Sequence, residues 1–243
     1  MRLLRAGFPD DPAIDVAVGH ALLERAARGE IGPTLRVYRP GPTCAFGRLD
    51  TLADGFGAAG AAARAHGFEP VLRQPGGHAA AYDGGALCVD HVRPEAEAIP
   101  RLQARFEEAG ELFAAALRAV GVDARVGEIP GEYCPGQWTV SARGAVKLVG
   151  TAQRLVRGAS LLGAVVLVRG GARVRAVLED VNAALGLEWD PATAGAAEDE
   201  VPGLTVDAVE RAVLHAYGGP LEPATLDEAT RARARELAAR NRL

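Results

Sequence analysis

The chain has 243 residues, of which 49% are hydrophobic and 24% charged, and its formal net charge is −4. A disordered chain would have fewer apolar residues and a larger excess of charge, so one sizeable folded domain is expected. The isoelectric point near 5.8 argues against a basic surface for nucleic acid. The longest mainly apolar stretch, residues 159–168, is far shorter than the roughly 20 residues that cross a bilayer. Because acidic residues soon follow Met1 in place of a signal peptide, we expect a cytoplasmic protein without nucleic-acid or membrane partners.

The cysteines and histidines form no metal or disulfide pattern. Cys44, Cys88 and Cys134 are an odd number and include no Cys-x-x-Cys pair, and the five histidines include no His-Glu-x-x-His. A disulfide framework and a cysteine-rich zinc site are therefore not expected. We predict no metal ion bound by protein side chains alone.

The first half of the chain alternates predicted helices with short strands. Two acidic residues before Pro12 are typical of a helix start, and this helix is predicted to end near Gly29. Residues 35–38 predict a strand that ends at a Pro-Gly-Pro turn, and residues 44–47 are predicted to pair with it. The pattern then predicts a helix at 57–66, strands at 70–73 and 86–92, and the clearest helix at 100–120.

The second half begins with a predicted strand–turn–strand, residues 138–141 and 146–149, in which Gly150 ends the second strand. Thr225 to Glu228 has the form of a capping box for a last helix. Between them the sequence predicts a strand at 161–168, helices at 174–185 and 205–217, and a loop at 190–203. Hairpin-like strand pairs with intervening helices predict an α+β fold with a mixed, mostly antiparallel sheet flanked by helices.

A single lysine stands out among the basic residues. Of 27 basic side chains, Lys147 is the only lysine. Arginine serves equally well at exposed sites, but it does not supply a compact point charge on a flexible stem. Lys147 is therefore a candidate for chemistry that a guanidinium does not perform, and chance in an arginine-rich composition is the alternative.

Three segments contain residues suited to a reaction. In residues 73–78 (Arg-Gln-Pro-Gly-Gly-His) a glycine pair lets backbone N–H groups approach a ligand, although such pairs are also ordinary turns. Cys134 precedes Pro-Gly, which places its thiol in a loop, whereas the other two cysteines lie in predicted strands and are expected in the core. Lys147 has apolar neighbours on its strand, where it would stabilise an anion; a lysine at a strand edge with its amine in water is the alternative. Only twelve residues separate Cys134 from Lys147, so both are expected near one acyl carbonyl.

Together these segments resemble the lipoate–protein ligase and octanoyltransferase family, which has the biotin/lipoate ligase catalytic fold. Residues 73–83 (Arg-Gln-Pro-Gly-Gly-His-Ala-Ala-Ala-Tyr-Asp) resemble the family's Arg-Arg-x-Thr-Gly-Gly-(Gly/Arg)-Ala-Val-x-His-Asp loop. Residues 147–154 (Lys-Leu-Val-Gly-Thr-Ala-Gln-Arg) are similar to its Lys-(Val/Ile)-x-Gly-Ser-Ala-Gln-Arg segment. Residues 134–138 (Cys-Pro-Gly-Gln-Trp) partly match the nucleophile segment of one octanoyltransferase branch, and the likeness spans about residues 10–215.

The resemblance implies roles for individual residues. Lys147 would bind the acyl carbonyl or acyl-phosphate oxygen, and Cys134 would be the nucleophile. The substrate would be bound by Arg73, Gly76, Gly77, His78, Tyr82, Asp83, Gly150, Thr151 and Ala152. Pro75, His78 and Tyr82 depart from the family pattern, and these departures bear on nucleotide binding more than on acyl binding.

Three functions follow from the resemblance. The first is transfer of an octanoyl or lipoyl group, through a Cys134 thioester, to the lysine of a lipoyl-carrier domain, with Lys147 stabilising the oxyanion. The second is ATP-dependent lipoate ligation through lipoyl-AMP, which alone would bring ATP and Mg²⁺. The third is a non-catalytic acyl-binding or assembly partner with the same fold. The expected partners are a lipoyl domain or a glycine-cleavage H-type carrier protein, and an acyl carrier protein as a further donor.

The expected domain organisation is simple. Residues 1–220 are predicted to form the catalytic domain. Residues 221–243 hold about one helix, too little for an independent domain, and this helix is expected to pack on the first unit or to trail from it.

Overall fold

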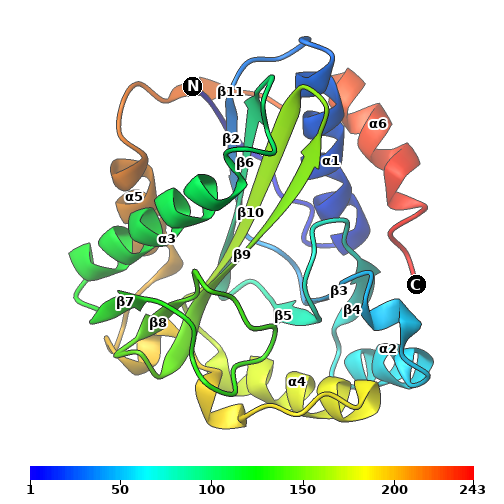
Figure 1. Ribbon diagram of the computed structural model, residues 1–243, viewed down its shortest axis with the longest axis vertical. Helices are drawn as coiled ribbons and strands as arrows, with labels where there is room; N and C mark the ends of the chain where they lie inside the picture. The colour runs from blue at the N-terminus through cyan, green and yellow to red at the C-terminus, as the bar shows by residue number, and fades with distance from the viewer.

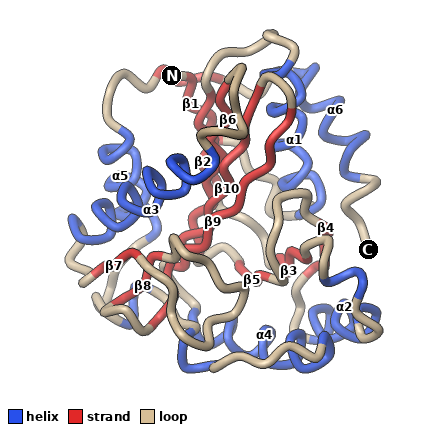
Figure 2. The backbone as a smooth tube through the Cα atoms, in the orientation of Figure 1, coloured by secondary structure: helices blue, strands red, loops and turns tan.

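A computed structural model describes all residues, 1–243. Its main feature is an eight-stranded sheet with the order β11-β1-β2-β6-β10-β9-β8-β7 (Figures 1 and 2). Its strands are β1 (Arg2–Arg5), β2 (Thr34–Tyr38), β6 (Ala86–Pro94), β7 (Ala124–Val126), β8 (Val140–Ala142), β9 (Val146–Val156), β10 (Ala159–Leu167) and β11 (Glu222–Ala224). Strand β1 pairs in parallel with β2 and β11, and every other pairing is antiparallel. The predicted mixed, mostly antiparallel sheet is confirmed.

A second, three-stranded sheet has the order β4-β3-β5. It consists of β3 (Thr43–Phe46), β4 (Glu69–Leu72) and β5 (Ala80–Tyr82), with β3 parallel to β4 and antiparallel to β5. The prediction that residues 44–47 pair with 35–38 was therefore wrong. The intervening Pro-Gly-Pro turn runs so close to Pro9 that a methyl group on Gly41 would lie 1.8 Å from the Pro9 carbonyl oxygen. This close approach turns the chain away from β2 and into the smaller sheet.

Helices cover both faces of the large sheet and the outside of the small one (Figure 1). Helices α1 and α6 pack together on one face, α3 and α5 pack together on the other, and α2 and α4 lie against the small sheet. Their bounds are α1 (Pro12–Ala27), α2 (Phe56–Ala65), α3 (Leu102–Ala119), α4 (Gly171–Leu185), α5 (Val206–Tyr217) and α6 (Glu228–Ala238). The predicted helices are thus confirmed, and residues 190–203 contain only two short 3-10 turns. None of the helices combines the length and the apolar character that a bilayer crossing requires.

The large sheet separates two hydrophobic cores. Along β10, Leu161 and Leu167 pack into the core beneath α1, whereas Leu162, Ala164 and Val166 pack into the core beneath α3 and α5. This alternation follows from the two-residue period of a strand, which sends successive side chains to opposite faces. The predicted strand at 161–168 reads as nearly continuous apolar sequence because both of its faces are covered.

Strand β9 is longer than predicted and has a free outer edge. It continues through Gly150 to Val156 in a hairpin with β10, so the prediction that Gly150 ends the strand was wrong. The backbone ladder with β10 keeps Gly150 in the strand, opposite Val165, despite the low strand propensity of glycine. On its other side β9 pairs with β8 only up to Val149. Beyond that residue the outer edge of β9 has no neighbouring strand.

The C-terminal residues join the same structure. Strand β11, which the sequence pattern did not predict, extends the large sheet, and α6 then packs on α1. Helix α6 is capped by Asp227, whose carboxylate accepts from Thr230 N at 2.9 Å. The predicted capping box at Thr225 was therefore wrong, because β11 leads into Leu226, which is buried in the core. Asp227 also pairs with Arg25 of α1 at 2.5 Å.

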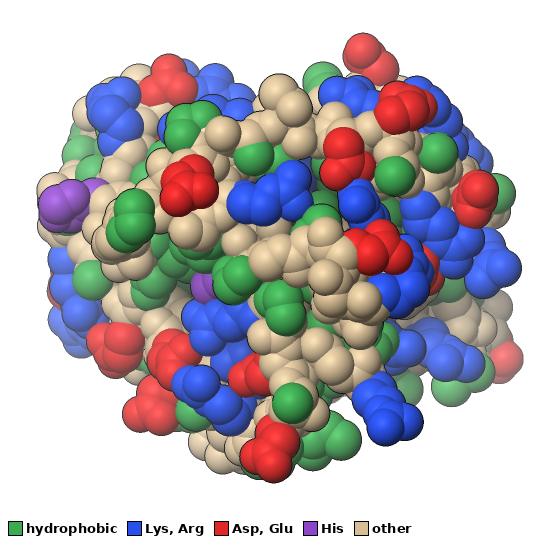
Figure 3. Space-filling model, turned by 90° about the horizontal axis from the view of Figure 1, so that it is seen from above, with side chains coloured by type: hydrophobic (Ala, Val, Ile, Leu, Met, Phe, Trp, Pro, Cys, Tyr) green, Lys and Arg blue, Asp and Glu red, His purple; other side chains and the backbone are tan.

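Acidic and basic side chains are interspersed over the face seen in Figure 3. Many arginines of the protein form ion pairs with carboxylates, both within elements and between them. Examples are Arg5 with Glu210 at 2.8 Å and Arg125 with Asp123 at 2.7 Å. Exposed pairs of this kind contribute little to stability individually, roughly 0–1 kcal/mol.

Candidate active site

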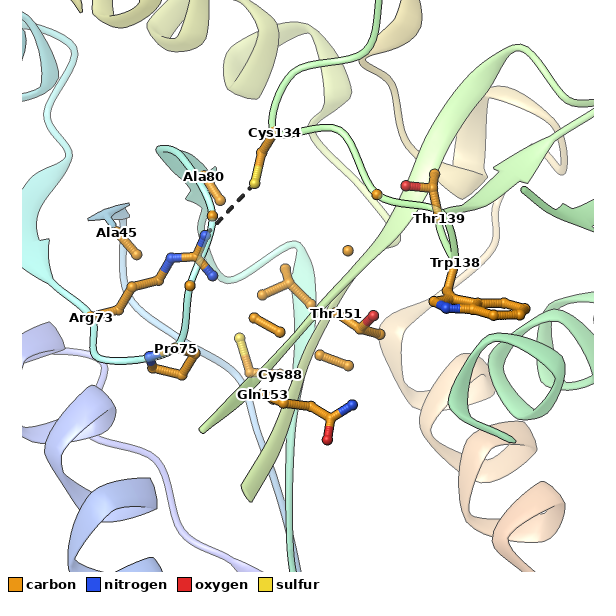
Figure 4. A pocket seen from close by; sticks show the side chains of 18 of the residues that line it. Ala45, Arg73, Pro75, Ala80, Cys88, Cys134, Trp138, Thr139, Thr151 and Gln153 are labelled. Atoms are coloured by element: carbon orange, nitrogen blue, oxygen red, sulfur yellow. Dashed lines mark hydrogen bonds between the residues drawn. The ribbon is translucent and has the colours of Figure 1, made fainter. Parts of the chain in front are cut away.

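A cavity of about 500 Å³ lies between the two sheets. Its walls come from the loop after β4, the loop that precedes β8, helix α1 and the first turn of α3 (Figure 4). Four successive residues of β9, from Gly150 to Gln153, line the cavity. Successive residues of a strand point to opposite faces of the sheet, so the cavity reaches both faces of β9 where that strand has no neighbour on its outer side. The longer strand thus shapes the cavity.

The floor of the cavity is formed by residues that pair in register across the large sheet, with glycine or alanine at its β9 end. Gly150, Val165 and Cys88 are direct partners across β9, β10 and β6, and Tyr38 of β2 continues this row. The next row on the same face is formed by Ala152, Gly163, Asp90 and Arg36. Direct partners in a sheet share a face, and the missing side chains at the glycines leave room above the strands.

Cys134 lies in the loop that covers this floor. Its backbone has a φ of +46°, a left-handed conformation that costs a non-glycine residue about 1–2 kcal/mol. Its sulfur accepts a hydrogen bond from Arg73 Nη2 at 3.7 Å, the dashed line in Figure 4, and one from His78 N at 3.2 Å. The sulfur is thus held between a backbone N–H and a guanidinium, on the side of the loop that faces the glycine turn.

Only one of the two glycines, Gly77, is needed for the contact between Arg73 and the Cys134 sulfur. Gly77 has a φ of +98°, and a methyl group there would lie 2.8 Å from both Cys134 Sγ and Arg73 Nη2. Gly76 has open space around it. Gly77 is therefore the position where a side chain would push the thiol away.

Arg73 connects the loop to the sulfur. Its Nη2 also donates to the carbonyl oxygen of His78 at 2.8 Å, which closes the glycine turn. Its Nε is buried without a hydrogen-bond partner. This N–H is thus an unsatisfied donor in the interior, although other parts of the Arg73 side chain line the cavity.

Lys147 lies in the cavity wall next to this loop, with its side chain only 4% exposed. Its ammonium contacts three acceptors: the Cys134 carbonyl oxygen at 2.7 Å, the Tyr133 carbonyl oxygen at 3.1 Å and the Glu132 carboxylate at 2.7 Å. An ammonium group has three donors. Lys147 thus donates two hydrogen bonds to the backbone at the thiol and forms an ion pair with Glu132, all within the loop that carries Cys134.

Glu132 is a site residue that the sequence patterns did not single out. Its side chain is completely buried, and besides Lys147 it accepts from Thr139 Oγ1 at 2.8 Å, Ile129 N at 3.1 Å and Gly136 N at 3.4 Å. One carboxylate thus joins both ends of the Cys134 loop to β9. The sequence feature that could have pointed to Glu132 is its position in a Pro- and Gly-rich loop, two residues before Cys134.

His78 supports the loop from outside the cavity. Its backbone N–H contacts the sulfur, but its side chain does not line the cavity and instead places Nδ1 2.7 Å from Asp50 Oδ1. The other oxygen of Asp50 accepts from Gly47 N at 2.8 Å. The imidazole therefore ties the glycine turn to the loop after β3.

The structure brings most of the predicted substrate-binding residues together. The exception besides the His78 side chain is Asp83, which does not line the cavity and pairs with Arg173 Nη1 at 2.7 Å. It lies just past the end of β5, where its carboxylate also accepts from Gly85 N. The predicted residues that line the cavity are Arg73, Gly76, Gly77, Tyr82, Cys134, Lys147, Gly150, Thr151 and Ala152.

The other two cysteines differ from Cys134. Cys44 and Cys88 are buried, as expected, whereas Cys134 is partly exposed. Burial raises the pKa of Cys44 to about 12 and holds the pKa of Cys88 well above its ordinary value. Both thiols stay protonated near neutral pH, so Cys134 is the cysteine of interest for nucleophilic chemistry.

The sequence matches the family model of the Lipoyl protein ligase A/B catalytic domain over residues 11–217. It is 31% identical over 162 residues to the Octanoyl-[GcvH]:protein N-octanoyltransferase of Geobacillus kaustophilus. The aligned region covers 67% of this chain and 57% of that protein. The protein of the same name from Exiguobacterium sibiricum is 35% identical over 134 residues, covering 54% of this chain and 46% of the relative. The matched region thus spans about half the length of these curated relatives.

Solved structures share the fold. Protein Ta0514 from T. acidophilum with bound lipoic acid superimposes with a TM-score of 0.77, covering 98% of this chain and 95% of that one at 22% identity. A lipoate-protein ligase A bound with ATP gives a TM-score of 0.74, covering 98% and 94%, also at 22% identity. The region that matches the family model contains both the loop of Cys134 and the strand of Lys147. Because this match covers most of the sequence, the chain belongs to the Lipoyl protein ligase A/B catalytic domain family.

Proposed function

We propose that this protein is an acyltransferase that carries an octanoyl or lipoyl group as a thioester on Cys134 and passes it to the lysine of a lipoyl-carrier domain. The observation on which this rests is the position of Cys134 Sγ at the cavity wall, 3.2 Å from His78 N and 3.7 Å from Arg73 Nη2. Two donors hold the sulfur at the wall of the cavity, where a nucleophile reaches the carbonyl of a bound acyl group.

The reaction has two acyl-transfer steps. In the first, the thiolate attacks the acyl carbonyl, a C–S bond forms, and the bond to the donor breaks as the donor's leaving group takes a proton. In the second, the acceptor lysine amine attacks the thioester, an amide forms, and the amine proton is released as the thiolate leaves. Each step passes through an oxyanion, and donors already oriented at the cavity wall would stabilise it.

Lys147 has a double role in this proposal. In the free protein its ammonium holds the Cys134 loop through two carbonyl oxygens and Glu132. To stabilise an oxyanion it must exchange one of these acceptors, and the Cys134 carbonyl oxygen is the one nearest the nucleophile along the chain. Arg73 Nη2 and the backbone N–H of His78 are the other donors next to the nucleophile.

The substrates follow from the relatives. Their name specifies an octanoyl group on GcvH and a protein acceptor, and we propose the same kinds of donor and acceptor here, with an acyl carrier protein as a further donor. Among the residues that line the cavity, Tyr82, Gly150, Thr151 and Ala152 would contact the acyl chain. ATP-dependent ligation through lipoyl-AMP is the competing function, and Mg²⁺ would then accompany the nucleotide.

The decisive experiment measures the native mass of the protein after incubation with octanoylated carrier protein alone and, separately, with free octanoate and ATP. We expect a thioester adduct without ATP that is absent in Cys134→Ser. Cys44→Ala, which removes a buried thiol that does not line the cavity and leaves the loop thiol in place, is the matched control and should still form the adduct. Full transfer by Cys134→Ser would refute the thioester step, and an adenylate adduct formed only with ATP would establish ligation instead.

We also propose that residues 221–243 belong to the same folding unit as residues 1–220. Arg233 of α6 pairs with Glu24 of α1 at 2.7 Å, and Leu72 N donates to the Asn241 carbonyl oxygen at 2.8 Å. Removal of residues 221–243 is therefore expected to lower the unfolding temperature of the whole protein. Unchanged thermal unfolding of the truncated chain would contradict this.

A further inference from the structure

Asp50 is a buried carboxylate just outside the cavity, in the short 3-10 turn that follows β3. Its side chain is completely buried, and its two oxygens have different partners. Oδ2 accepts from Gly47 N at 2.8 Å, and Oδ1 lies 2.7 Å from His78 Nδ1. Because a carboxylate only accepts hydrogen bonds, the imidazole is the donor in the second contact. Bonds at both oxygens fix the orientation of this carboxylate.

His78 is held at three points. Its side chain donates to Asp50, and its carbonyl oxygen accepts from Arg73 Nη2 at 2.8 Å. Its backbone N–H donates to Cys134 Sγ at 3.2 Å. One residue therefore connects a buried carboxylate to the nucleophile of the proposed reaction.

The glycine turn before His78 supplies little restraint of its own. Gly76 has open space around it, and Gly77 adopts a φ of +98°, in a region that glycine enters freely. The turn rests on Gly47, where a methyl group would lie 1.7 Å from the Gly77 carbonyl oxygen. Asp50 bonds to both sides of this contact, to the Gly47 N–H and to the imidazole of the residue after Gly77. The position of the His78 N–H thus depends on Asp50.

The pair lies behind the wall of the cavity. Gly77 and Cys134 line the cavity, whereas neither Asp50 nor the residue it binds, His78, does. The two side chains therefore do not contact a bound acyl group, and their effect passes through the backbone. A group displaced by about 1 Å from its place at a reacting atom costs on the order of 100-fold in rate, and a donor to an oxyanion is such a group.

We infer that Asp50 and His78 are a positioning pair, in which the buried carboxylate, through the imidazole, keeps the His78 backbone N–H at the reacting sulfur. In the free protein this N–H donates to Cys134 Sγ. In each acyl-transfer step it is available to the oxyanion that forms beside the sulfur. The catalytic consequence rests on the proposed function, whereas the contact itself is testable without a substrate.

The first test measures single-turnover thioester formation at increasing concentrations of octanoylated carrier protein. His78→Ala should lower the maximal rate roughly tenfold or more and leave the half-saturating concentration unchanged, because the side chain does not line the cavity. His78→Asn places an amide nitrogen near the position of Nδ1, where it donates to Asp50, and should restore most of the rate.

A second histidine–aspartate pair provides the matched control. His66 Nε2 lies 2.7 Å from Asp180 Oδ2 between α2 and α4, and neither residue lines the cavity. His66→Ala should therefore keep the wild-type rate. A wild-type rate in His78→Ala, a raised half-saturating concentration at an unchanged rate, or a failure of His78→Asn to exceed His78→Ala overturns the inference.

The second test needs no acyl group. Cys134→Ala removes the sulfur and should shift the NMR resonance of the His78 amide proton. In an Asp50→Ala background the same substitution should shift that resonance much less, because the N–H has already left the sulfur; His78→Ala, which keeps the N–H, replaces Asp50→Ala if the latter unfolds. Equal shifts in both backgrounds overturn the inference. A wild type that forms no thioester refutes the proposed function, and the NMR comparison still decides whether the pair holds the N–H at the sulfur.

Discussion

Gly77 lies so close to Cys134 that a single methyl group on its α-carbon would approach the sulfur to 2.8 Å. The same methyl group would approach Arg73 Nη2 to 2.8 Å, and the residue adopts a φ of +98° that side-chain-bearing residues rarely adopt. The glycine turn and the cysteine loop therefore fit together only if position 77 has no side chain. This fit positions both donors at the sulfur.

Gly77→Ala is accordingly expected to displace the Cys134 thiol and to lower acyl transfer at least tenfold. Strain at the positive φ adds a destabilisation of about 1–2 kcal/mol. Thioester formation in single-turnover mass spectrometry is the measurement. Gly76→Ala is the matched control, because position 76 has open space and its transfer rate should stay near that of the wild type. Equal rates in the two variants would contradict the proposed fit.

Glu132→Gln tests the carboxylate that joins the loop to Lys147. The substitution preserves size but leaves the buried ammonium of Lys147 without its counter-charge, a loss of about 3 kcal/mol or more for a buried pair. We expect a lower unfolding midpoint in urea and slower transfer, because the Cys134 loop loses its central anchor. Glu128→Gln, at an exposed position of the same loop, should change neither measurement. A Glu132→Gln protein with wild-type stability would show that the ion pair does not hold the loop.

Lys147→Arg tests whether positive charge alone is sufficient. The ammonium of Lys147 fits between two carbonyl oxygens and a carboxylate, whereas a planar guanidinium is larger and directs its donors as a fixed fork. We therefore expect Lys147→Arg to lose most of its transfer activity while retaining the charge. The check is the rate of adduct formation with the octanoylated carrier, together with a thermal unfolding curve. Activity near the wild-type level in Lys147→Arg would mean that the three-acceptor geometry is unimportant.

The elements that followed from local pattern were predicted well, whereas pairings between distant segments were not. The apolar stripe of α3 and the apolar run of β10 are visible within a short window of sequence. The partner of β3 instead depends on the close packing of Gly41 on Pro9, about thirty residues away. The periodicity of apolar residues in the sequence does not indicate such a contact. Likewise the ladder with β10 keeps Gly150 inside β9.

The same distinction applies to the site. Cys134 and Lys147 were singled out from local features, a thiol in a Pro-Gly loop and a lone lysine on an apolar strand, and both lie at the cavity. Glu132 acquires its role only when the loop folds against β9, and the isolated sequence assigns it no more weight than any other acidic residue. Asp83 was expected among the substrate contacts, but its partner Arg173 lies ninety residues further along the chain. Side chains that depend on tertiary neighbours are the ones that sequence patterns misplace.

His91 predicts how stability depends on pH. It is buried on β6 against the ring of Tyr217, and burial, followed by the charge of Arg93, lowers its pKa to about 3. The unfolded chain binds a proton near pH 6.5 whereas the folded chain does not, so stability is complete above pH 6.5 and falls as pH decreases from 6.5 towards 3. At pH 5 the loss from this residue is about 2 kcal/mol. Urea unfolding at pH 8 and pH 5 measures it.

His91→Gln is expected to reduce the difference in unfolding free energy between pH 8 and pH 5 by about 2 kcal/mol. The comparison with the wild type is needed because other buried groups titrate in the same range. His20, with a pKa lowered to about 4, acts in the same direction, whereas Asp15, whose pKa burial raises to about 6, stabilises the fold as pH falls. His215→Gln, at an exposed position, should leave the wild-type difference unchanged. If His91→Gln and the wild type respond equally to acid, the imidazole of His91 is protonated in the folded protein and the burial argument fails.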